Sequence, residues 1–263
     1  MEQDLVISRA LVSIFSAPGL ARSLAFRGGT ALYKLHLRPA SRYSEDIDLV
    51  QLEAQPAGSM MTALRATLDP WLGTPQWKQT QGRVTFVYRF ESGDTPPVRL
   101  RLKVEINSRE HFAVFGTVGV PFQIESRWFR GTATITTYCL EELLATKLRA
   151  LYQRRKGRDL FDLSAALKSG QADPEQIIAA FGQYMASSGQ RVTRAEFDQN
   201  LQRKLTDPQF TADIGPLLAG GGSWDILDAA AMVTKELIDR LPGAPRIATS
   251  GKRSPGRRGD AGS

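Results

Sequence analysis

The chain has 263 residues, of which 42% are hydrophobic and 23% charged, so it can form a soluble globular protein with a substantial core. No stretch approaches the roughly 18 uncharged apolar residues that a membrane-spanning helix needs, and the acidic N-terminus is unlike a secretory signal. One cysteine excludes an intramolecular disulfide and, with only two histidines, a zinc site built from His and Cys. We expect a cytoplasmic protein.

The net charge of +7 is distributed unevenly. Residues 242–263 contain five basic residues and one acidic residue and are rich in Gly and Pro, a composition typical of a disordered basic tail. The rest of the chain is only mildly basic, which is compatible with a nucleotide or nucleic-acid substrate.

In chain order, residues 3–17 carry apolar side chains at helical spacing and are predicted to form an amphipathic helix. A short apolar strand at 24–26 then breaks at Gly28-Gly29-Thr30, which opens an amphipathic segment to about residue 37. The stretch 46–50 alternates as a strand, so Asp46 and Asp48 share one face while the apolar residues between them face a core.

This stretch carries the residues of a nucleotide and metal site. Two carboxylates spaced by about 7 Å along a strand can converge on a pair of Mg²⁺ ions that serve in-line phosphoryl displacement. Backbone N–H groups at Gly28, Gly29 and Thr30 can bind phosphate where the helix begins. Alone, the acidic pair is more often a solvated strand end and the glycines a tight turn, but their combination is far more specific.

A second helix is predicted over 60–72, after Ser59 as a candidate cap, and two alternating strands over 83–90 and 98–106, joined by a turn. Residues 113–137 are β-rich and irregular. On the polar face of the strand 98–106, Glu105 is the candidate third metal ligand beside the acidic pair. The alternative is an exposed strand residue that pairs with neighbouring basic side chains, namely Arg101 and Lys103.

From residue 140 the chain is predicted to be helical. Helices are expected over 141–152, 159–167, from Asp173-Pro174 onward, 193–204 and 223–240. Lys147 and Arg154 lie two helical turns apart and would present two cations on one face, which suits a triphosphate. The alternative is an ordinary solvated basic face. Residues 1–138 would form a mixed-sheet catalytic lobe and 139–241 a helical lobe that contributes phosphate-binding residues, with a cleft between them.

Two blocks of the sequence resemble the AbiEii family of nucleotidyltransferase toxins, which include MenT-like toxins and belong to the wider DNA polymerase β-like superfamily. The blocks are G-G-T-A-L-x-K-L with R-x-S-E-D-I-D-L, and K-L-x-A-L-x-x-R-x-x-x-R-D-L-F-D-L. The resemblance implies an α+β fold in which a polymerase β-like lobe with a mixed sheet precedes a helical lobe. It assigns Ser44, Glu45, Asp46 and Asp48 to the acidic motif, nucleotide phosphate binding to Lys147, and a further functional acid to Asp162.

The same resemblance implies a toxin of a toxin–antitoxin or abortive-infection system, with a cognate antitoxin as partner. It would transfer a nucleoside monophosphate from an NTP, with two Mg²⁺ ions, to an RNA acceptor, for which the tRNA 3′ end is expected, and so block translation. One alternative is nucleotidylation or phosphorylation of a protein, such as the antitoxin. Another is a non-catalytic nucleic-acid-binding protein, against which the intact motifs count.

Further hypotheses concern single side chains near this site. Phosphorylation of Ser44 would add negative charge beside the acidic pair and inactivate the protein. Tyr33, Tyr43 and Phe161 are candidates for stacking on a base, and the alternative for each is packing in a core.

Overall fold

The structure, a computed structural model, describes residues 2–219 and 224–244. The first part of the chain interleaves helices and strands: α1 (Glu2–Ser16), α2 (Pro18–Ser23), β1 (Leu24–Arg27), α3 (Gly28–Ala31) with the π-helical turn η1 (Leu32–His36), β2 (Asp46–Gln51) and α4 (Ala57–Leu72). Five strands follow: β3 (Gln76–Thr80), β4 (Arg83–Glu91), β5 (Arg99–Asn107), β6 (Thr117–Glu125) and β7 (Arg130–Tyr138). The remainder is helical: α5 (Leu140–Gln153), α6 (Gly157–Lys168), α7 (Pro174–Ser187), α8 (Arg194–Leu205), α9 (Pro208–Ala212), η2 (Gly215–Leu217), α10 (Ile226–Glu236) and η3 (Ile238–Arg240).

The strands form one mixed sheet in the order β3-β4-β5-β2-β1-β7-β6, with β2 at its centre. β2 pairs antiparallel with β1 and parallel with β5, while β1 pairs parallel with β7. The expected α+β fold with a mixed sheet is therefore confirmed. Because β2 lies between two long-range partners, its acidic face is positioned by residues far away in the sequence.

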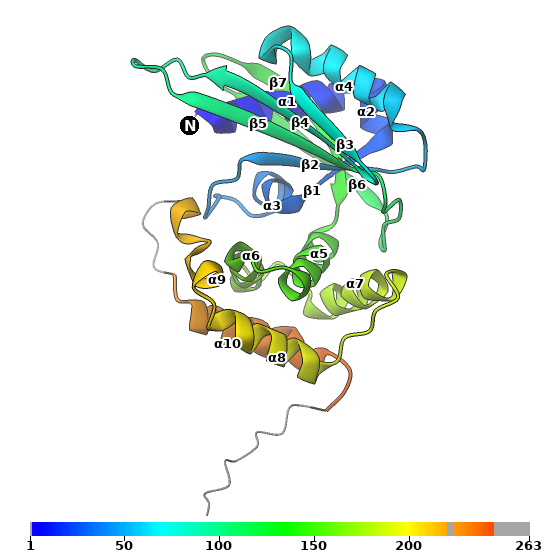
Figure 1. Cartoon of the computed structure of the whole chain (residues 1–263), viewed down its shortest axis with the longest axis vertical. Helices are drawn as coiled ribbons and strands as arrows, with labels where there is room; N and C mark the ends of the chain where they lie inside the picture. Colours follow the sequence, from blue (N-terminus) through cyan, green and yellow to red (C-terminus); the bar gives the residue numbers. More distant parts are fainter. Residues whose placement is uncertain (1, 220–223, 245–263) are drawn as a thin grey trace, which may run out of the picture.

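One face of the sheet is covered by α1, α2 and α4, and the other looks toward the helical part of the chain (Figure 1). The alternation of β5 explains this, because Leu102, Val104 and Ile106 are buried against the first group of helices. A second core holds α5 to α10 together and includes Leu32 and Tyr33 of η1, whereas Ala31 of α3 belongs to the core under the sheet. The segment that follows β1 therefore joins the sheet to the helical layer.

Several predicted elements need correction. Ser59 is no cap, because α4 begins at Ala57 after Pro56 and no side chain caps it. The irregular region at 113–137 contains two regular nine-residue strands, β6 and β7, whose outward residues obscured the alternation. The edge strand β3 escaped prediction because all of its residues are exposed. Val98 lies before β5 and is 53% exposed, so it does not share the buried face.

The predicted change from sheet to helices at residue 138 coincides with the end of β7, but the division into two lobes stays a prediction. The predicted disordered tail falls largely on 245–263, outside the described residues. None of the helices in the described ranges is long and apolar enough to cross a membrane.

Glu142, fully buried in α5, ties the helical layer to the loop after β5. Its carboxylate accepts hydrogen bonds from the backbone N–H groups of Val114 (2.7 Å) and Phe115 (3.0 Å) and from the Tyr184 hydroxyl (2.6 Å). Removal of the carboxylate would leave three donors without this partner, and one of them, the Tyr184 hydroxyl, is buried.

We predict that Glu142→Ala lowers the free energy of unfolding by about 3 kcal/mol, measured by urea denaturation. Glu141→Ala is the matched control, since Glu141 makes only a 3.4 Å contact to the Asp173 N–H, and should cost less than about 1 kcal/mol. Equal losses in the two variants would contradict this role of Glu142.

Candidate active site

The two glycines at the end of β1 make room for charged side chains. Gly28 has a φ of +82°, and a Cβ atom there would overlap the Asp48 carboxylate. A Cβ atom on Gly29 would overlap the guanidinium of Arg42. Asp48 and Arg42 approach the backbone so closely that only glycine fits at these two positions. This steric requirement explains the glycines independently of the predicted phosphate contact.

Thr30 and Ser44 connect the start of α3 to the strand that carries the acidic pair. The Thr30 hydroxyl lies 2.5 Å from the Ser44 hydroxyl and donates to the Asp46 backbone carbonyl. Thr30 is buried, whereas Ser44 lines a cleft. Thr30 therefore fixes the loop before β2, and Ser44 remains in contact with the open space in front of Asp46.

The carboxylates come together through the parallel pairing of β2 with β5. In this register Asp48 is opposite Glu105 and Asp46 is opposite Lys103. The Lys103 ammonium lies 3.0 Å from Glu105 and 3.5 Å from Asp46, and Arg83 lies 3.2 Å from Glu105. Glu105 thus stands beside the acidic pair, as expected, and also pairs with Lys103, as the alternative expected. Its second basic partner is Arg83 and not the Arg101 that the alternative named.

The pKa of Asp48 is raised above its usual value, first by burial and then by the negative charges of Glu105 and Asp46. The Arg27 and Lys147 side chains act in the opposite direction without cancelling this effect. A cation close to these three carboxylates would relieve their mutual repulsion.

These carboxylates are the candidate ligands for a divalent metal ion. In the part of the chain that the structure describes, no group of three His, Cys, Asp or Glu side chains is arranged as a ready metal site. Asp46, Asp48 and Glu105 nevertheless line one cleft, and Lys103 places its positive charge between two of them. Mg²⁺ commonly takes one or two carboxylates and completes its coordination with substrate phosphates and water, so the residues fit.

The opposite wall of the cleft rests on two fully buried aspartates of α6, Asp159 and Asp162. The Lys147 ammonium lies 2.8 Å from Asp162 and 3.3 Å from Asp159. Arg42 binds Asp162 through two hydrogen bonds of 2.6 and 2.8 Å, and Arg154 binds Asp159 through two of 2.7 Å. Three cations therefore share two buried carboxylates, which leaves this wall with one excess positive charge.

Asp162 acts on the site through its partners. It is completely buried, receives a further hydrogen bond of 3.0 Å from the Tyr33 hydroxyl, and does not line the cleft. Burial alone would raise its pKa, but the charges and hydrogen bonds of Lys147 and Arg42 lower the pKa of Asp162 to about 2. Its place marks Asp162 as a positioning residue for Lys147 and Arg42, both of which do line the cleft.

The structure brings most of the predicted site residues to this cleft, whose volume is about 310 Å³. Those that line it are Gly29, Ser44, Asp46, Asp48, Glu105, Lys147 and Arg154. Gly28 lies against the Asp48 side chain, and Thr30 is buried and hydrogen-bonded to Ser44. The roles assigned to these residues remain predictions.

The reason given for pairing Lys147 with Arg154 is wrong, although the two side chains do converge. Arg154 lies beyond the end of α5 in an extended conformation, so the two residues do not share a helical face. They meet because both bind Asp159, the third residue of α6, whose N-cap position is occupied by Lys156.

Four further basic residues of the cleft received no role from the sequence: Arg42, Arg83, Lys156 and Arg158. Arg42 belongs to the R-x-S-E-D-I-D-L block, so the motif itself contained the signal. Arg158 is held by two hydrogen bonds of 2.9 and 3.0 Å to Asp213, a partner 55 residues away that no local pattern reveals.

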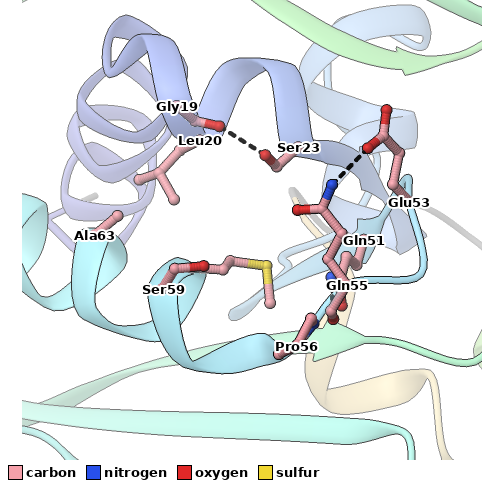
Figure 2. A pocket seen from close by; sticks show the side chains of 10 residues that line it. Gly19, Leu20, Ser23, Gln51, Glu53, Gln55, Pro56, Ser59 and Ala63 are labelled. Carbon is pink, nitrogen blue, oxygen red and sulfur yellow. Dashed lines mark hydrogen bonds between the residues drawn. The ribbon is translucent and has the colours of Figure 1, made fainter.

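Another hollow, of about 240 Å³, lies between α2, α4 and the loop after β2 (Figure 2). Its lining is mostly apolar or uncharged, with hydrogen bonds from Ser23 to the Gly19 carbonyl and from Gln55 to Glu53. It lacks the facing carboxylates and cations of the first cleft, which we therefore take as the candidate active site.

We predict that Gly28→Ala lowers the free energy of unfolding by roughly 2 kcal/mol, because the new Cβ combines an unfavourable φ with overlap of Asp48. Gly58→Ala in α4 is the control, since nothing surrounds that position, and should be neutral or slightly stabilising. Chemical denaturation measures both variants. A wild-type free energy of unfolding in Gly28→Ala would refute the close approach of Asp48.

The lowered pKa of Asp162 predicts a pH-dependent contribution to stability. An aspartate with a native pKa of about 2 instead of 3.8 contributes about 2 kcal/mol above pH 4, which is lost as the pH falls toward 2. The difference in unfolding free energy between wild type and Asp162→Asn should therefore shrink over this interval. A difference independent of pH in denaturation experiments would contradict the buried ion pairs.

Comparison with known proteins places the chain in a family. The model of the nucleotidyl transferase AbiEii toxin of the type IV toxin–antitoxin system matches residues 9–232. MenT4, a nucleotidyltransferase toxin from Mycobacterium tuberculosis, has a similar fold, with a TM-score of 0.63, 19% identity, and coverage of 91% of this chain and 84% of that one. JHP933 from Helicobacter pylori is similar with a TM-score of 0.57, 18% identity and 90% coverage of both chains. A search of curated proteins finds no match. The chain belongs to the AbiEii family of nucleotidyltransferase toxins, and membership of a toxin–antitoxin family implies a cognate antitoxin.

Proposed function

We propose that the chain transfers a nucleoside monophosphate from an NTP to an RNA acceptor, the 3′ end of tRNA, and that this modification blocks translation. The observation that carries the proposal is the composition of the cleft: carboxylates of β2 and β5 face the cations that α5 and α6 present. The tRNA acceptor rests on the family resemblance.

The charge of the cleft suits a triphosphate. Seven basic and four acidic side chains line it, so a polyanion finds a surplus of positive charge. Lys147 and Arg154 are held in place by buried aspartates, and Lys156 and Arg158 are held by Asp213. Cations fixed before the substrate arrives need little reorganisation to stabilise charge that develops in the transition state.

Asp46, Asp48 and Glu105 would hold divalent metal ions. Bound Mg²⁺ would neutralise phosphate charge and activate the attacking hydroxyl. Lys103 would balance the negative charge of Asp46 and Glu105 in the metal-free protein, and its ammonium group could bind substrate phosphate oxygens once metal ions take over the carboxylates.

In the proposed reaction, the acceptor 3′-oxygen forms a bond to the α-phosphorus of the NTP while the bond between the α-phosphorus and the bridging oxygen of pyrophosphate breaks. The hydroxyl proton passes to a carboxylate of the β2–β5 wall and from there to water, and pyrophosphate leaves with the electron pair. Lys147, Arg154 and Arg158 would stabilise the charge of the departing pyrophosphate. Ser44 would stand beside the phosphates, where phosphorylation introduces repulsion.

The proposal is tested with purified protein, Mg²⁺, total tRNA and each α-labelled NTP in turn. We expect label on the tRNA from at least one NTP, and a loss of at least about 100-fold in Asp48→Asn, because the substitution removes a charge at the proposed metal site. Glu125→Gln is the control, since Glu125 lies on β6 and pairs with the exposed Arg130.

Label on protein instead of RNA would overturn the RNA acceptor, and γ-labelled NTP would then separate phosphorylation from nucleotidylation. No transfer to either acceptor by folded protein would overturn the catalytic proposal.

A further inference from the structure

The three aromatic side chains considered for base stacking have different environments. Tyr33 is buried and donates to Asp162, and Phe161 is buried against Trp224 with ring centroids 5.0 Å apart. Tyr43 is 60% exposed and lines the candidate active site. Only Tyr43 of the three therefore offers a ring face to a ligand.

The backbone that carries Tyr43 is fixed on both sides. Its N–H donates to the Leu217 carbonyl (2.7 Å), and its carbonyl accepts from the Arg42 guanidinium (2.9 Å). The same guanidinium is bound to the buried Asp162, and Arg42 forms a β-bridge with Leu218. An exposed ring on an anchored backbone loses little entropy when it binds a ligand.

A second hollow of about 340 Å³ adjoins the cationic cleft, and Tyr43 lines both. Ser44, Glu45 and Leu217 are the other residues shared by the two spaces. The hollow has an apolar wall that includes Val98 and Leu100. Its far side is closed by the β4–β5 hairpin, because the Gly93 N–H binds the Glu2 carboxylate at 3.0 and 3.1 Å.

The two adjoining spaces have opposite charge. The described residues that line the hollow include no Lys or Arg, and four of them are acidic: Glu2, Asp4, Glu45 and Asp94. Phosphate groups are therefore attracted to the cleft and repelled from the hollow. A neutral, flat, aromatic group fits the hollow, whereas a strand of nucleic-acid backbone does not.

We propose that Tyr43 and the adjoining hollow form the nucleobase subsite for the incoming nucleotide, whose triphosphate occupies the cationic cleft. The base stacks on the Tyr43 ring and lies toward the apolar wall formed by Val98 and Leu100. This inference rests on the proposed function and adds to it the place and the orientation of the nucleotide.

The test measures equilibrium binding by titration calorimetry with Mg²⁺ and no acceptor, using the four NTPs and, as a probe without a base, inorganic tripolyphosphate. Loss of stacking in Tyr43→Ala should lower the affinity for the best-bound NTP about tenfold or more and leave the affinity for tripolyphosphate unchanged. Tyr43→Phe should retain wild-type affinity because it keeps the ring. Trp128→Ala is the control, since Trp128 is 69% exposed on the β6–β7 turn and lines neither space.

Wild-type affinity for every NTP in Tyr43→Ala, with tripolyphosphate still bound, would overturn the subsite and leave the proposed function standing. In a separate titration with tRNA alone, weaker tRNA binding by Tyr43→Ala together with unchanged NTP binding would also overturn it, because the ring would then serve the acceptor. If the wild-type protein bound neither NTP nor tripolyphosphate, the proposed function would fail and the subsite with it.

Discussion

The buried ion pairs between Arg42, Lys147 and two aspartates of α6 are the interaction on which the site depends. Charges inside a protein are costly unless each is paired and hydrogen-bonded, and loss of one partner leaves the others uncompensated. Arg42 comes from the loop before the central strand, whereas Lys147 comes from the first helix after the sheet. One network therefore fixes the two walls of the cleft relative to each other.

On the sheet side, the corresponding constraint is the parallel pairing of β2 with β5. This register brings Glu105 opposite Asp48, and the positive φ of Gly28 lets the Asp48 carboxylate lie against the backbone of the neighbouring turn. The raised pKa of Asp48 follows from this proximity together with burial. Negative charge is thus concentrated on one wall and positive charge on the other, an arrangement suited to a metal-bound polyphosphate.

Tyr43 lies between two spaces of opposite charge, and this arrangement favours one orientation of a bound nucleotide. The cationic cleft attracts phosphates, and the acidic, partly apolar hollow beside it repels them. A nucleotide can satisfy both only with its phosphates in the first and its base in the second. The buried network that holds Lys147 also anchors the Tyr43 backbone through Arg42, so phosphate and base would meet side chains positioned by the same contacts.

The sequence by itself determined the residues of the acidic strand, the Gly-Gly turn, the helical blocks and the resemblance to the family, because these signals lie within short segments. It even placed Glu105 on the polar face of its strand, since alternation is a local property. Only the tertiary structure decided that Asp162 lies beneath the cleft, that Arg154 reaches Asp159 from beyond the helix end, and that Tyr43 is the exposed ring. The burial of Asp162 depends on contacts with residues as far as 129 positions away, and the Arg154 contact depends on where α5 ends; local periodicity encodes neither.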